Sequence, residues 1–310
     1  MTESLRVTYG SHISELGNQR TDLVLLEADL ADSTQSEPFM FAHPERYFQM
    51  GIAEQNMVSV AAGLASEGKL PVVNSFAAFI SMRACEQVRT DVAYPNLNVK
   101  FVVSHAGVSA GTAGPTHHTL EDIAIMRSIP NLKVFVPGDA RELKQVISSV
   151  LSSDGPAYVR VSAIDVEGVY TDNTLYQQGK ATHLANGEDL TIITTGTMMH
   201  QGIQVVEELK KHNLNAQLLQ MASIKPLDKD AIIEAANHIP YIFTIEEHSI
   251  IGGLGSSVSE VLAENNLTCK LTRFGFNDAF CSIGGNVPFL LQKAGLDYKS
   301  IVKRILSVIG

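Results

Sequence analysis

Apolar runs of strand length alternate with helical stretches along the first half of this sequence, and this alternation constrains the fold more than any other feature. The strand-length runs occupy residues 23–28, 69–74, 99–103, 132–136 and 157–161, and the helical patterns occupy residues 53–67, 80–92 and 140–151. Right-handed crossovers join strands that are separated by helices, so this order predicts a mostly parallel sheet with helices on both faces.

The same alternation returns in the second half of the chain. Strands are expected over residues 190–194, 215–219 and 241–245, and helices over residues 200–212 and 256–264. Polar, turn-forming residues separate the two halves, which is typical of a linker. We therefore expect an α/β protein with two doubly wound domains, residues 1–165 and 185–310, joined by a linker over residues 166–184.

The composition is typical of an acidic cytoplasmic enzyme or enzyme subunit. The 310 residues carry a net charge of −10, with no basic stripe for nucleic acid and no basic amphipathic stretch for a membrane surface. The cysteines Cys85, Cys269 and Cys281 are widely spaced, which favours free thiols over disulfides or a zinc site. We expect neither a signal peptide nor a transmembrane helix, because polar residues follow Met1 and no long apolar run occurs.

A single carboxylate, Glu54, opens the otherwise apolar helix that follows Met50. A carboxylate in the first turn is stabilised by the helix dipole and can face the carboxyl edge of the sheet, where open α/β folds bind ligands. The alternative is an ordinary acid at a helix start, which is the commoner case for position alone.

Segment 75–83 has a largely aromatic and thioether face. The residues at helical spacing are Phe76, Phe79, Met82 and Arg83. By itself, such a face is more often part of a core than a platform for a cofactor.

Residues 104–118 form a glycine-rich segment with three histidines, directly after a predicted strand. A polar, flexible loop at a strand end is typical of a binding site. Metal binding by these histidines is a rival hypothesis. We discount it, and predict no metal ligand in this chain, because no neighbouring cysteine or carboxylate completes a ligand set at a familiar spacing.

Together, four segments resemble the pyrimidine-binding and C-terminal parts of transketolase-type thiamin diphosphate enzymes. The segments are Gly51-Ile-Ala-Glu-Gln-Asn56, Gly114-Pro-Thr-His-His118, Arg127-Ser-Ile-Pro-Asn-Leu-Lys-Val134 and Glu246-Glu-His-Ser-Ile-Ile-Gly-Gly253. The resemblance runs from about residue 20 to the C-terminus. It implies that residues 1–165 are a thiamin diphosphate pyrimidine-binding domain and that residues 185–310 are a transketolase C-terminal domain.

The resemblance assigns cofactor-binding roles to five residues. It implies that Glu54 bonds the N1′ atom of the cofactor's aminopyrimidine ring and thereby activates the cofactor. It further implies that Phe79 stacks on this ring, and that Phe76 and Met82 wall the pocket. Asp29 matches a residue near the cofactor.

The resemblance also assigns roles toward an anionic ketose. His105 and His117 match catalytic histidines that contact the sugar oxygens and relay protons. Ser33 matches a residue near the donor sugar, and Arg160 resembles an arginine that holds a substrate anion, typically phosphate. The implied reaction is transfer of a two-carbon ketol unit from a ketose to an aldose, as in the pentose phosphate pathway.

Thr112 and Ala113 depart from the family pattern, which usually has an acidic pair before the Gly-Pro-Thr-His segment. The aspartate normally found there binds a sugar hydroxyl. Its absence leaves the identity of the sugar open, including a branched sugar, a deoxy sugar or one with another anion.

The motif that holds the diphosphate is missing from this chain. The family uses a Gly-Asp-Gly motif with a downstream asparagine to bind the diphosphate through Mg²⁺, and the nearest match here, Gly138-Asp-Ala140, lacks the second glycine. The resemblance therefore implies a partner, an N-terminal transketolase subunit that binds the diphosphate and the Mg²⁺. A heterotetramer with two chains of each kind is the natural symmetric assembly.

Three alternatives stay open. The chain could be the β-subunit of a 2-oxo-acid dehydrogenase, part of a deoxyxylulose-phosphate synthase-like enzyme, or a non-catalytic binding subunit of the same fold. His105 and the segment 114–118 favour sugar chemistry, and the retained Glu54 favours catalysis. A plain nucleotide-binding protein is disfavoured, because no GxGxxG motif follows the first strand.

Overall fold

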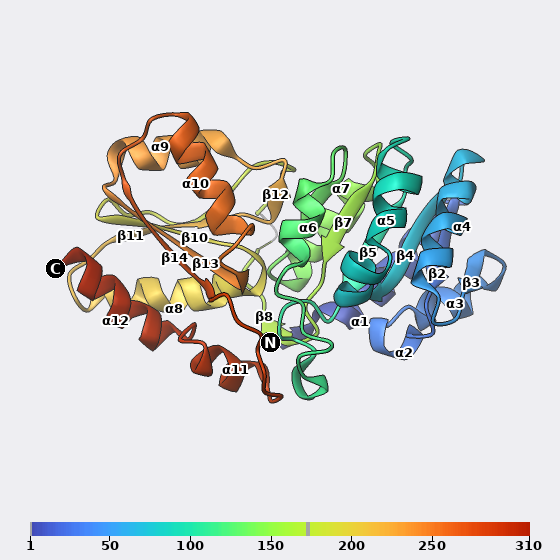
Figure 1. The fold of residues 1–310 in the computed structure, drawn as a ribbon, viewed down its shortest axis with the longest axis horizontal. Coiled ribbons are helices and arrows are strands. Elements are labelled where there is room, and N and C mark those ends of the chain that lie inside the picture. Colours follow the sequence, from blue (N-terminus) through green and yellow to red (C-terminus); the bar gives the residue numbers. More distant parts are fainter. Residues whose placement is uncertain (1, 172–173) are drawn as a thin grey trace.

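The computed structural model describes residues 2–171 and 174–310, which form two large sheets that lie side by side and are flanked by helices (Figure 1). Met1 lies outside the described residues, as do residues 172 and 173 of the expected linker. The predicted α/β class with mostly parallel sheets is confirmed.

A seven-stranded sheet forms the core of the first half of the molecule. Its order is β12-β6-β7-β5-β4-β2-β3, and every neighbouring pair is parallel except β12 and β6. The strands are β2 (Leu23–Glu27), β3 (Tyr47–Gln49), β4 (Leu70–Phe76), β5 (Lys100–Ser104), β6 (Lys133–Phe135), β7 (Ala157–Arg160) and β12 (Ser223–Lys225).

Helices cover both faces of this sheet. One face packs against α1 (Leu5–Gln19), α3 (Glu37–Ala42) and α7 (Ala140–Leu151), and the other against α4 (Glu54–Ser66), η3 (Val88–Ala93) and α6 (Asp122–Ser128). Alternate residues of a strand point to opposite faces, so Leu23 and Leu25 join the first core and Val24 and Leu26 the second. The shorter helical elements are α2 (Ala31–Thr34), η1 (Pro44–Arg46), η2 (Phe79–Arg83), α5 (Cys85–Gln87) and η4 (Gly111–Ala113).

A five-stranded sheet of order β14-β13-β10-β11-β9 forms the core of the second half. Its strands are β9 (Thr182–Ala185), β10 (Leu190–Thr194), β11 (Ala216–Gln220), β13 (Tyr241–Ser249) and β14 (Lys270–Phe276). The helices on one face are α8 (Met199–Lys210), α11 (Val287–Lys293) and α12 (Tyr298–Ile309), those on the other are α9 (Lys229–His238) and α10 (Leu254–Glu264), and η5 (Gly196–Met198) precedes α8. The core beneath α9 and α10 is continuous with the core beneath α4 and α6.

Two short strands each pair with a strand that is distant in the sequence. β12 belongs to the second half of the sequence but pairs antiparallel with β6 at the edge of the first sheet. β1 (Thr2–Ser4) pairs antiparallel with β8 (Asp165–Glu167) at the start of the expected linker. Backbone hydrogen bonds therefore join distant parts of the chain at both places.

One predicted element is wrong in detail. The helix expected over residues 80–92 is divided into η2, α5 and η3, and both η2 and η3 are π-helical turns. π-Helical turns are often found at functional sites, and η2 carries Phe79 of segment 75–83.

Candidate active site

The carboxyl ends of β2, β4 and β5 meet at one edge of the first sheet, because these strands are parallel neighbours. Asp29 follows β2, Phe76 ends β4, and His105 follows β5. Asp29 and His105 adopt left-handed backbone conformations, with φ angles of 62° and 57°. Such conformations are unfavourable for non-glycine residues and cluster at functional sites, so this edge is the candidate active site.

Glu54 lies in the first turn of α4 and is only 1 % exposed. The Ser75 hydroxyl donates to Glu54 Oε1 over 3.1 Å, and Arg83 Nη1 donates to Glu54 Oε2 over 2.6 Å. A buried carboxylate needs such partners, and the positive end of the helix dipole adds to their stabilisation. Sequence reasoning did not assign roles to Ser75 and Arg83, although both belong to the segment that it singled out.

The rings of Phe76 and Phe79 are stacked beside this carboxylate, with centroids 5.8 Å apart and an interplanar angle of 15°. The Arg83 guanidinium carbon lies 4.4 Å from the Phe79 ring centroid. Met82 belongs to the same π-helical turn as Phe79 and is 46 % exposed. The structure thus brings Glu54, Phe76 and Phe79 into one group of contacts.

His105 and His117 also contact the aromatic group. The His105 ring centroid is 3.9 Å from that of Phe76, and the His117 ring meets Phe79 edge-on at 5.5 Å. Burial lowers the pKa of His105 to about 4, and the charges of Arg6 and His117 act in the same direction. His105 is therefore neutral at pH 7, and its Nδ1 lies 2.9 Å from the Ser104 hydroxyl.

Arg6 is a residue of the candidate site that sequence reasoning missed. Its Nη1 donates to the Ser33 carbonyl oxygen over 2.7 Å, while its Nε is buried with no hydrogen-bond partner among the described residues. Arg6, Thr34 and Ser104 also line a crevice that is too narrow to hold a water molecule. The resemblance begins only near residue 20, so no motif draws attention to this arginine.

The loop that carries Asp29 and Ser33 is held by a buried acid at the end of β2. Glu27 Oε2 accepts hydrogen bonds of 2.7 Å from both Thr34 Oγ1 and Ser36 Oγ. Burial raises the pKa of Glu27 to about 7, against the opposing effect of these hydrogen bonds. Asp29 itself is exposed, and the structure does not bring its side chain into the aromatic group.

Arg160 does not lie in position to hold a substrate anion, which corrects the role expected for it. Its side chain is buried, and Nε donates to Asp122 Oδ2 over 2.8 Å. Its Nη2 donates to the carbonyl oxygens of Glu247 and Thr119, over 3.0 and 3.4 Å. A guanidinium engaged in this way is a structural group between the two halves of the chain.

The third histidine of the loop, His118, is buried, and its Nε2 lies 3.0 Å from the Gly111 carbonyl oxygen. Thr112 and Ala113 fall in η4 and are exposed. Gly285 N–H donates to the Gly111 carbonyl oxygen over 3.4 Å, so the loop before α11 lies next to these two residues, which depart from the family pattern.

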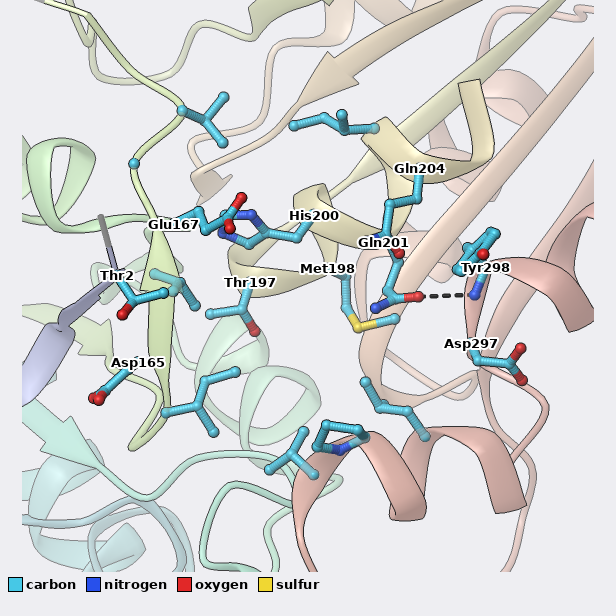
Figure 2. Close-up of a pocket in the computed structure, with 18 of the residues that line it drawn as sticks. Thr2, Asp165, Glu167, Thr197, Met198, His200, Gln201, Gln204, Asp297 and Tyr298 are labelled. Carbon is cyan, nitrogen blue, oxygen red and sulfur yellow. Dashed lines mark hydrogen bonds between the residues drawn. The ribbon is translucent and has the colours of Figure 1, made fainter. Parts of the chain in front are cut away.

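A separate cavity of about 630 Å³ lies between β8, α8 and the two C-terminal helices (Figure 2). Asp165, Glu167, His200 and Gln201 are among its lining residues, and none of the predicted site residues lines it. Among residues 2–171 and 174–310, no group of three or more His, Cys, Asp or Glu side chains is arranged to hold a metal ion. Within the same ranges, no helix is both long and apolar enough to cross a membrane.

Comparison with known families agrees with this geometry. Residues 3–168 match the family described as "Transketolase, pyrimidine binding domain", and residues 179–301 match "Transketolase, C-terminal domain". The chain therefore belongs to the transketolase family, whose domains imply thiamin diphosphate binding.

Relatives of similar length are named as parts of transketolases. A putative transketolase C-terminal section from Methanocaldococcus jannaschii is 45% identical, over 98% of this chain and 96% of the relative. A 6-deoxy-6-sulfo-D-fructose transketolase subunit from Clostridium sp. is 38% identical, over 96% of this chain and 92% of the relative. One of the apulose-4-phosphate transketolase subunits, from Phocaeicola vulgatus, is 36% identical, over 98% of this chain and 97% of the relative.

Solved structures extend the comparison. A structure described as a split gene transketolase, an inactive beta4 tetramer, has a TM-score of 0.90 and 38% identity, and the match covers 99% of this chain and 98% of the other. The transketolase of Campylobacter jejuni has a TM-score of 0.82 at 19% identity, so that likeness concerns the fold alone. This chain matches 47% of the Campylobacter chain, whereas it matches nearly all of the split transketolase chain.

Proposed function

We propose that this chain is the pyrimidine-binding subunit of a thiamin diphosphate-dependent transketolase, which transfers a two-carbon ketol unit from an anionic ketose to an aldose. One observation carries the proposal: the buried Glu54 carboxylate lies at the head of α4, beside stacked phenylalanines that are flanked by His105 and His117. The relatives named as transketolase subunits support the same interpretation.

The residues present fit an aminopyrimidine. The ring needs a flat aromatic surface and a carboxyl group at N1′, which Phe79 and Glu54 offer. Arg83 contacts both side chains, so they lie close together. Glu54 would hold a proton at N1′, and the Ser75 hydroxyl would keep Oε1 oriented. When bound, thiamin diphosphate supplies a nucleophilic carbon and an electron sink for cleavage of the ketose.

The sugar would lie on the histidine side of the aromatic group. Neutral His105 can accept a hydrogen bond from a sugar hydroxyl at pH 7, because its pKa is lowered to about 4. Arg6 is the cation that we assign to the sugar's anionic group in place of Arg160, since it is only half-buried, bonds the loop at Ser33, and its charge acts on His105. Thr112 and Ala113 are exposed small side chains, which leaves room for a sugar with an unusual substituent.

A partner subunit would supply the diphosphate and Mg²⁺ site, and a heterotetramer is the assembly that we propose. The missing Gly-Asp-Gly motif supports this division, as do full-length relatives that are about twice as long as this chain. A second candidate, deoxyxylulose-phosphate synthesis, is favoured by one observation: the 1-deoxy-D-xylulose-5-phosphate synthase of Desulfotalea psychrophila is 33% identical over 99% of this chain and 48% of its own.

The test is reconstitution with a chain that carries the Gly-Asp-Gly motif, in a buffer with thiamin diphosphate and Mg²⁺. Ketose phosphates and sulfonated ketoses are screened as two-carbon donors, and pyruvate with glyceraldehyde 3-phosphate is tested for the second candidate. We expect ketol transfer only when both chains are present. Full activity of this chain alone, or pyruvate decarboxylation without ketol transfer, would overturn the proposal.

A further inference from the structure

The segment that carries His105 and His117 is closed at its base by contacts between its own ends. Thr119 N–H donates to the Gly107 carbonyl oxygen over 2.8 Å, as an antiparallel bridge. The two histidines therefore project from a loop of residues 105–119 whose width depends on what holds that base.

Glu247 reaches this base from β13, in the second sheet. Its side chain is only 4 % exposed, and its Oε1 accepts a hydrogen bond of 2.6 Å from Val108 N–H. A Cβ atom on Gly107 would overlap the Glu247 carboxylate, and Gly107 has a φ angle of 65°, so a glycine is needed there on both counts. The carboxylate thus lies directly beneath the His105 end of the loop.

The other end of the loop is held from the same strand. Arg160 Nη2 donates to the carbonyl oxygens of both Glu247 and Thr119, which links β13 to the end of the loop near His117. Ser249 N–H, two residues farther along β13, donates to the Leu120 carbonyl oxygen over 2.7 Å. Residues 247–249 therefore contact the loop at both ends of its base.

We infer that Glu247 is a positioning residue, which fixes the spacing of His105 and His117 by anchoring the base of their loop to the second sheet. The inference rests on the proposed function for the role of the histidines, but the anchoring itself is a property of this chain. It gives the C-terminal half a direct effect on the sugar end of the active site, whereas Glu54 and Phe79 depend on the first half.

Glu246 provides a matched control, because it is the neighbouring residue on β13 and is also buried. Its carboxylate accepts hydrogen bonds from Leu254 N–H and Gly255 N–H, over 2.7 and 2.8 Å, at the start of α10. Burial raises the pKa of both glutamates, so the two differ mainly in what they hold. No hydrogen bond from the described residues joins the Glu246 carboxylate to the loop.

Hydrogen–deuterium exchange of the chain, alone and in the reconstituted complex, tests the anchor without reference to activity. Glu247→Ala and the shorter Glu247→Asp are expected to raise exchange over residues 105–119, including the Val108 amide, while Glu246→Ala raises it near residues 252–258. Glu247→Gln can still accept from Val108 N–H and should restore much of the protection. Unchanged exchange over residues 105–119 in Glu247→Asp and Glu247→Ala would overturn the inference.

Kinetics then test positioning. Glu247→Ala and Glu247→Asp should lower kcat/KM for the sugar roughly tenfold to 100-fold, because small misplacements of catalytic groups have effects of this size. The Kd for thiamin diphosphate should stay within about twofold, since the Glu54 side is not touched. Equal losses in the Glu246 and Glu247 variants would mean a purely structural role. If the wild-type complex shows no ketol transfer, the proposed function fails, and the exchange experiment still decides the anchor.

Discussion

Arg83 binds the Glu54 carboxylate over 2.6 Å while its guanidinium lies 4.4 Å from the Phe79 ring centroid. These are the carboxylate oxygen and the ring that the proposed aminopyrimidine would use. We therefore expect Arg83 and the cofactor to compete for these two partners, so that Arg83 moves or shares Oε2 when the cofactor binds.

Arg83→Gln is expected to tighten the binding of thiamin diphosphate to the reconstituted complex. Arg83 is 44 % exposed although Glu54 is buried, so its ion pair and cation–π contact together should be worth about 1 kcal/mol, and the Kd should fall roughly fivefold. Isothermal titration calorimetry measures this directly. Arg89→Gln removes the same charge from the exposed side of η3 and should leave the Kd unchanged. Weaker binding in Arg83→Gln would show that Arg83 assists the cofactor instead.

Glu54→Gln and Glu54→Ala should each reduce ketol transfer by at least about 100-fold, because neither side chain can exchange a proton with N1′. Steady-state kinetics of the reconstituted complex at saturating cofactor provide the measurement. Glu67→Gln, at the exposed opposite end of α4, is the control and should retain wild-type kcat. Near-normal turnover in either Glu54 variant would refute the assigned role.

Arg6→Gln should raise the pKa of His105 from about 4 toward its ordinary value near 6.5, because the Arg6 charge is one cause of the lowering. The folded pKa of His105 lies below the unfolded value, so this histidine makes folding less stable as pH falls from 6.5 toward 4. Arg6→Gln should bring the folded and unfolded pKa values of His105 closer together, and should therefore narrow the pH range over which this stability is lost. Histidine NMR titrations of the chain give the pKa, and urea unfolding between about pH 4 and 7 gives the stability.

The same variant should raise the KM for an anionic ketose roughly tenfold or more, since a charge-assisted contact with the anion is lost. Lys69→Gln removes an exposed positive charge elsewhere and serves as the control. An unchanged KM would mean that Arg6 does not bind the anion, and the anion-binding residue would then be sought in the partner subunit.

Gly10→Ala should destabilise the chain by about 1–3 kcal/mol, because a Cβ there would overlap the Gln35 carbonyl oxygen that packs against α1. Gly63→Ala is the opposite case, since no described atom beyond its chain neighbours and the α4 backbone lies within 4 Å of a Cβ at that position. It should stabilise the chain by about 1 kcal/mol through helix propensity alone. Denaturant unfolding of the two variants measures the change in the free energy of unfolding. It thereby compares the effect of close packing on α1 with that of helix propensity on α4.

The elements with strong hydrophobic patterns were predictable from sequence. α7 spans Ala140–Leu151 and β10 spans Leu190–Thr194, as expected, because an amphipathic period and a buried apolar run leave little choice. α1 was not expected, since Gly10 and Gly17 lower its helix propensity. Tertiary packing requires glycine at both positions, because Gln35 and His43 pack closely against them.

The site was predictable where a motif carried it and not where distant contacts did. Glu54, Phe76, Phe79, His105 and His117 occur in recognisable segments, and the structure brings them together. Arg160 was misread because an arginine at a strand end can serve an anion or a buried acid, and only its contact with Asp122 distinguishes the two. The roles that we propose for Arg6 and Glu247 rest on contacts between residues far apart in sequence, which no local pattern reveals.

The strand β12 has a consequence for any attempt to divide the molecule. A fragment that ends within the linker would leave the edge of β6 without its antiparallel neighbour, and an open strand edge invites aggregation. The pyrimidine-binding half is thus completed by residues 223–225, more than fifty positions past its own end. Truncation within the linker should yield an insoluble product, so the two halves should be expressed together as a single chain.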